Sequence, residues 1–154
     1  MWFEIDLSGV RVMFCVTGYR ATDKNDWDSA WCSCDFSFSF GNCLDYHREN
    51  CEVLLASEID ELEREFSKLL AGELSNPEDI VCVEPDFVFK LYPQRDLKDY
   101  SQCGCPVQDI YLEWRIYFWD GDITENYFSL TFGREDIERF RDYLSSVIKR
   151  GSCF

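Results

Sequence analysis

The cysteines are the residues of this sequence whose type and spacing most readily suggest chemistry. Two C-x-C pairs, Cys32 with Cys34 and Cys103 with Cys105, could offer thiolates to a metal ion or form a redox couple. Structural zinc sites usually draw their thiolates from C-x-x-C pairs, and the chain contains none. Whether these thiols could form a metal or redox site therefore depends on the secondary structure that carries each pair.

Cys32 and Cys34 fall in residues 28–40, where side-chain types alternate as on a strand. One face of that strand would carry Cys32, Cys34, Phe36, Phe38 and Phe40. Because that face is rich in phenylalanine it should be the core face, where a thiol packs as a small hydrophobic group. Side chains two apart on a strand lie about 6.6 Å apart and do not easily converge on one zinc ion at about 2.3 Å. We expect two buried thiols here.

Cys103 and Cys105 flank a glycine in the aperiodic stretch 93–106, which reads as a loop or insertion. Binding of a metal, oxidation and a reduced loop all stay open for this pair. The chain has nine cysteines, and an odd count argues against a closed disulfide framework. The N-terminus lacks a secretory signal and no stretch is long enough to span a membrane, so we expect a cytoplasmic location with reduced thiols.

No other arrangement in the sequence points to catalysis. His47 is the single histidine, and nothing nearby marks a nucleophile that it would activate. Asp120 and Asp122 flank a glycine, an arrangement that a tight turn explains more simply than acid–base catalysis does. Phosphate-binding and dinucleotide-binding glycine motifs are absent. We therefore predict a protein that is not an enzyme and that needs no cofactor.

The net charge of −15 narrows the range of partners. Such a chain repels nucleic acids and anionic membranes, whose phosphates carry the same sign, and attracts basic proteins. The acidity could also do no more than keep an aromatic-rich chain soluble, and both interpretations stay open.

Two stretches have the period of amphipathic helices, residues 57–71 and 134–149. Ser57 and Asp60 suit a capping box for the first, and Gly72 suits its end. The stretches that read as strands are 10–19, 28–40, 43–56 with a bulge, 86–92, 107–119 and 123–132. Asp-Gly between the last two is a strong hairpin signal. We predict one α+β domain over 1–154, with an antiparallel sheet of about seven strands, like a sandwich or half-barrel, and two helices.

Acidic residues next to exposed aromatic rings are the best candidates for a binding site, because interfaces place such anchors beside complementary charge. One group lies in the loop after Tyr19 and the other at the tip of the last hairpin. The candidate contacts are Asp23, Asp26, Trp27, Asp28, Trp119, Asp120, Asp122 and Glu125. The acidic face of helix 57–71 is a second candidate, and a solvated face is the alternative for each group.

Several of these stretches resemble the WapI-type immunity proteins. Residues 16–42, VTGYRATDKNDWDSAWCSCDFSFSFGN, are similar to the front half of that family, with Gly18, Tyr19, Asp28 and Trp31 at its motif positions. VCVEPDFVFKLYP resembles the family's E-P-x-F-x-F strand, and the final YFSLTFGREDIERFRDYLSSVIKR its closing strand and helix. Cys32 stands where the family usually has leucine, and the loop with Cys103 and Cys105 has no counterpart.

The resemblance implies a bacterial antidote of polymorphic-toxin or contact-dependent inhibition systems. Such a protein would bind the C-terminal domain of a cognate toxin, often a basic nuclease, as a monomer or weak dimer, and would occlude its active site. Two alternatives remain. An acidic DNA mimic would inhibit many nucleic-acid enzymes, and a metal-binding protein would use the C-x-C pairs.

Overall fold

The computed structural model describes residues 1–21, 30–84, 86–93 and 109–151. The predicted contacts Asp23, Asp26, Trp27 and Asp28, and the pair Cys103 and Cys105, lie outside these ranges. In chain order the elements are β1 (Phe3–Leu7), β2 (Val10–Thr17), β3 (Trp31–Phe40), β4 (Leu44–Leu55), α1 (Ala56–Ala71), β5 (Glu78–Val81), β6 (Phe87–Tyr92), β7 (Tyr111–Trp119), β8 (Ile123–Phe132) and α2 (Arg134–Gly151).

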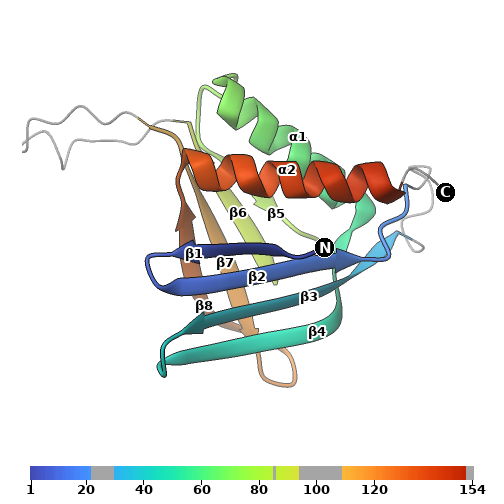
Figure 1. The fold of residues 1–154 in the computed structure, drawn as a ribbon, viewed down its shortest axis with the longest axis vertical. Coiled ribbons are helices and arrows are strands. Elements are labelled where there is room, and N and C mark those ends of the chain that lie inside the picture. Colours follow the sequence, from blue (N-terminus) through green and yellow to red (C-terminus); the bar gives the residue numbers. More distant parts are fainter. Residues whose placement is uncertain (22–29, 85, 94–108, 152–154) are drawn as a thin grey trace, which may run out of the picture.

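The strands form two four-stranded antiparallel sheets, sheet A in the order β1-β2-β3-β4 and sheet B in the order β5-β6-β7-β8. Each sheet is followed by one helix, so the two halves share an element order. Sheet A lies in front of sheet B in Figure 1, their strands cross steeply, and both helices lie along one side of the pair. The predicted α+β class with antiparallel strands and two helices is confirmed.

Two strands that the sequence did not predict complete the sheets, β1 and β5. Both are short edge strands, of five and four residues, and neither repeats its alternation often enough to be recognised. The predicted bulge in residues 43–56 is present, because the pairing shifts between Cys34 and Phe36. Asn50 takes a positive φ of 53° at this bulge and its N–H donates to Asp35 Oδ1 at 2.8 Å.

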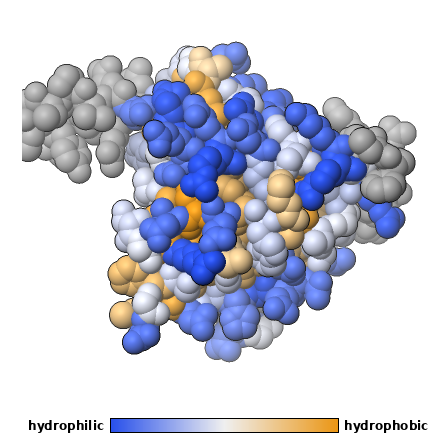
Figure 2. Space-filling view, viewed as in Figure 1, coloured by the Kyte–Doolittle hydropathy of each residue, from blue (hydrophilic) through white to orange (hydrophobic). Residues whose placement is uncertain are grey.

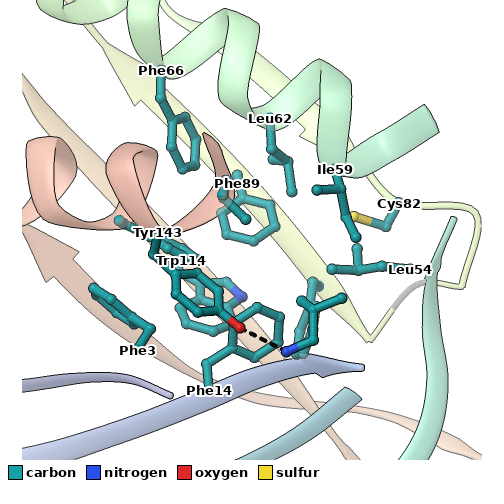
Figure 3. Close-up of a cluster of buried hydrophobic side chains, with 14 of the residues drawn as sticks. Phe3, Phe14, Leu54, Ile59, Leu62, Phe66, Cys82, Phe89, Trp114 and Tyr143 are labelled. Carbon is teal, nitrogen blue, oxygen red and sulfur yellow. Dashed lines mark hydrogen bonds between the residues drawn. The ribbon is translucent and has the colours of Figure 1, made fainter. Parts of the chain in front are cut away.

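The core lies between the two sheets and under both helices (Figure 3). The Trp114 ring is fully buried near its centre, with ring centroids 5.6 Å from Phe14 of sheet A and 5.4 Å from Phe140 of α2. The N–H of Val16 donates to the hydroxyl of Tyr143 at 2.7 Å, which ties β2 to α2. Phe40, predicted to face this core, is 45% exposed, because it ends β3 at the turn into β4.

The first helix begins differently from the prediction. Ser57 is not its cap, because α1 starts at Ala56 and the carboxylate of Glu58 accepts the N–H of Leu55 at 2.8 Å. The same carboxylate accepts the N–H of Val83 at 2.5 Å, which joins the start of α1 to the segment after β5. At the other end, Gly72 takes a left-handed φ of 73° and closes the helix as predicted.

Candidate functional site

The hairpin of β7 and β8 carries four of the predicted contact residues and projects at the bottom of Figure 1. At its tip Gly121 has a φ of 74°, and the N–H of Asp120 donates to the carbonyl of Asp122 at 2.9 Å. Asp122 Oδ1 accepts the N–H of Ile123 at 2.8 Å, so this side chain also shapes the turn. Asp120, Asp122 and Glu125 are all exposed. The turn therefore presents three carboxylates to solvent within six residues.

Trp119 is held in place at the base of this tip. Its indole N–H donates to the carboxylate of Asp86, and the guanidinium of Arg48 lies 4.8 Å from its ring centroid. The side chain is still 36% exposed. Because Asp86 precedes β6 and Arg48 lies on β4, Trp119 is fixed by residues of both sheets. A half-exposed ring with a fixed orientation is suited to bind another protein with little loss of entropy.

Asp86 connects this cluster to the interior. It is 1% exposed, and its Oδ1 also accepts Arg48 Nη1 at 2.6 Å. Its Oδ2 has no hydrogen-bond partner among the described residues. Burial raises the pKa of Asp86, although Arg48 and the Trp119 N–H lower it in part. Asp86 lies just before β6, and its burial contrasts with the half-buried side chains of Val88 and Lys90 on that strand.

Trp119 does not follow the simple alternation of β7. Strict alternation would put it on the outer face with Tyr117, but the pairing with β8 shifts between these two residues. The shift turns Trp119 toward Arg48 and Asp86, while its neighbour Phe118 packs against Tyr46 at 5.2 Å. No local signal predicts this contact, because Asp86 is 33 residues away along the chain.

The second candidate, the acidic face of α1, is largely used within the fold. Glu58 and Glu65 are each 7% exposed, so neither carboxylate is free to contact a partner or belongs to a solvated face. Glu65 pairs with Lys68 at 2.9 Å, and Asp60 accepts the hydroxyl of Tyr19 at 2.7 Å. Figure 2 shows mainly hydrophilic side chains over both helices, with separate small hydrophobic areas on this face.

Cys32, Cys34 and His47, which were considered for chemistry, lie in sheet A and outside the β7–β8 hairpin. Cys32 and Cys34 are fully buried, as predicted, and burial raises the pKa of Cys32 to about 12 and that of Cys34 well above its usual value. His47 is exposed on sheet A with Nδ1 3.8 Å from Asp45 Oδ1. Within the described ranges, no three cysteine, histidine or acidic side chains are placed to hold a metal ion.

Thiol reactivity should separate these cysteines. We expect Cys43, which is exposed, to react with iodoacetamide in the native protein, while Cys32 and Cys34 react only after unfolding, because burial hides them and keeps them protonated. Peptide mass mapping after a timed pulse measures this. Rapid native labelling of Cys32 would contradict the buried placement, and labelling in denaturant is the control for intrinsic reactivity.

Comparison with known proteins identifies the family of this chain. The model of the immunity protein WapI-like family matches residues 3–150, so the chain belongs to that family of immunity proteins. A search of curated proteins gives no match. Neither helix in the described parts of the chain is long and apolar enough to cross a membrane.

Proposed function

We propose that this protein binds the C-terminal domain of a cognate bacterial toxin through the β7–β8 hairpin and neutralises it by covering its active site. Membership in the immunity family supports the general role. The observation that carries the choice of surface is Trp119, fixed by Asp86 and Arg48 beside the exposed Asp120 and Asp122. An aromatic anchor next to carboxylates is a common form of binding hot spot for a basic partner.

The charge of the whole chain supports a basic toxin, such as a nuclease. A net charge of −15 creates a potential that attracts a cationic domain and raises its rate of association. The toxin surface that binds nucleic acid is itself cationic, so the acidic tip fits against that surface and excludes the substrate. Occlusion of this kind needs no catalysis, metal or cofactor, and it would take place in the cytoplasm.

A binding experiment with neighbouring toxins tests the proposal. The tagged protein is incubated with each toxin C-terminal domain encoded next to its gene. Complexes are isolated, and their molar mass is measured by light scattering. A tight 1:1 complex that abolishes the toxin's activity supports an immunity role. Inhibition of several unrelated nucleases would instead favour a DNA mimic, and absence of binding to every neighbouring toxin would remove the proposed function.

Charge reversal at the tip should slow association. For Asp120→Lys with Glu125→Lys, we expect an association rate about tenfold lower at low salt and a weaker dependence on ionic strength, because steering depends on local potential. Stopped-flow mixing with the toxin domain measures both. Asp45→Lys with Glu49→Lys is the matched control, since it makes the same change in net charge at exposed residues of sheet A. Equal slowing by both pairs would assign the effect to overall charge.

A further inference from the structure

The outer face of sheet B carries a groove next to the hairpin tip. Its volume is about 590 Å³, and its walls include Val81, Val88, Tyr117, Ile123, Glu125 and Tyr127. The register places these residues together: Val81 pairs with Val88, and Tyr117 pairs with Tyr127. Val81 is 65% exposed and Tyr127 is 43% exposed, and the Val81–Val88 pair lies in the cross-strand row next to the Tyr117–Tyr127 pair, so the four side chains form one exposed patch.

Tyrosines are concentrated on this face. Four of the eight in the chain, Tyr92, Tyr111, Tyr117 and Tyr127, lie opposite the core-facing residues of β6, β7 and β8. Tyr117 and Tyr127 contact each other with ring centroids 5.0 Å apart. Tyrosine is enriched at protein interfaces, because its ring buries a large area while the hydroxyl stays hydrated.

The cations of this face are already neutralised. Lys90 Nζ lies 2.5 Å from Asp79 Oδ2, and Arg115 Nε lies 2.8 Å from Glu113 Oε1. The Arg115 guanidinium also lies 5.0 Å from the ring centroid of Tyr127. Glu125, in contrast, has no ion pair with any side chain in the described ranges and keeps the rim acidic.

Charge decides between the two occupants that an apolar groove could take. A second copy would bring another −15 to an acidic rim, and this repulsion opposes self-association. A partner with an apolar side chain flanked by lysine or arginine matches both the lining and the rim. We infer that the groove receives such a basic-flanked apolar segment of the toxin domain, an inference that rests on the proposed function and extends the contact from the tip onto sheet B.

A matched pair of double variants tests the groove. Val81→Thr with Tyr127→Thr removes apolar surface from it, and threonine is a β-branched residue that strands accept well. Val83→Thr with Phe40→Thr is the control, because these residues are similarly exposed, 62% and 45%, and do not line the groove. With the neighbouring toxin domain as probe, we expect the groove pair to weaken affinity at least tenfold through faster dissociation. The control pair should stay within about twofold of wild type.

A second measurement uses the unaltered chain, so the test does not depend on how the variants fold. Hydrogen exchange of the wild-type complex should give added amide protection in β5 and in the start of β8. Wild-type affinity of the groove pair, or added protection confined to sheet A, would overturn the groove while leaving toxin binding intact. A dimer that the groove pair dissociates would assign the groove to a second copy. Absence of toxin binding by the wild type would remove both proposals.

Discussion

Replacing Trp119 with alanine is expected to weaken toxin binding about 30-fold or more, the loss of about 2 kcal/mol that defines a hot spot. At the base of the tip, the ring is held by Arg48 on β4 and by Asp86, which precedes β6. Its removal takes away contact area and leaves the carboxylate of Asp86 with one donor fewer. Titration calorimetry with the toxin domain measures the change.

Two variants identify the cause of that loss. Trp119→Phe keeps a smaller ring against Arg48 and loses the indole N–H to Asp86, so its affinity should lie between those of wild type and Trp119→Ala. Trp2→Ala removes an equally large exposed ring, 47% exposed, from the start of sheet A and should leave affinity unchanged. The same loss in Trp2→Ala and Trp119→Ala would exclude a hot spot at the hairpin.

The largest loss of stability is expected for Trp114→Ala. The side chain is fully buried, and its ring lies 5.1 Å from Phe87 and 5.3 Å from Phe89, measured between centroids. Truncating a buried tryptophan removes its transfer free energy and leaves a cavity, so the free energy of unfolding should fall by about 3–5 kcal/mol. Urea unfolding followed by circular dichroism measures it.

Trp114→Phe is the matched comparison, because the indole Nε1 is buried without a hydrogen-bond partner among the described residues. Phenylalanine removes that unpaired donor, which offsets part of the lost packing. We expect a loss clearly smaller than that of alanine. Equal losses for both substitutions would mean that the indole N–H is paired in solution.

The sequence predicts the helices and strands in which apolar residues recur at a regular spacing. The helices and the long strands β3, β7 and β8 repeat their apolar positions several times, so their faces are determined locally. Both helices were recognised within two residues of their observed ends. The short edge strands β1 and β5 were missed, because five and four residues do not establish an alternation.

The site was only partly predictable, for a different reason. Asp120 and Asp122 are marked by the turn glycine between them, so the hairpin tip could be placed from the sequence alone. Arg48 and Asp86 could not, because their contact spans 38 residues and joins two sheets. The groove likewise depends on the register of four strands, which no local pattern specifies.

The hydrogen bond from the Val16 N–H to the Tyr143 hydroxyl can form only when most of the chain has been synthesised. It links positions 127 residues apart, so the early strands of sheet A gain their covering helix only when α2 has been synthesised. At roughly 5–20 residues per second, a chain of 154 residues takes about 8–30 seconds to translate. Under the proposed function, a cell struck by toxin is protected by antidote molecules finished beforehand, and those still on the ribosome arrive late.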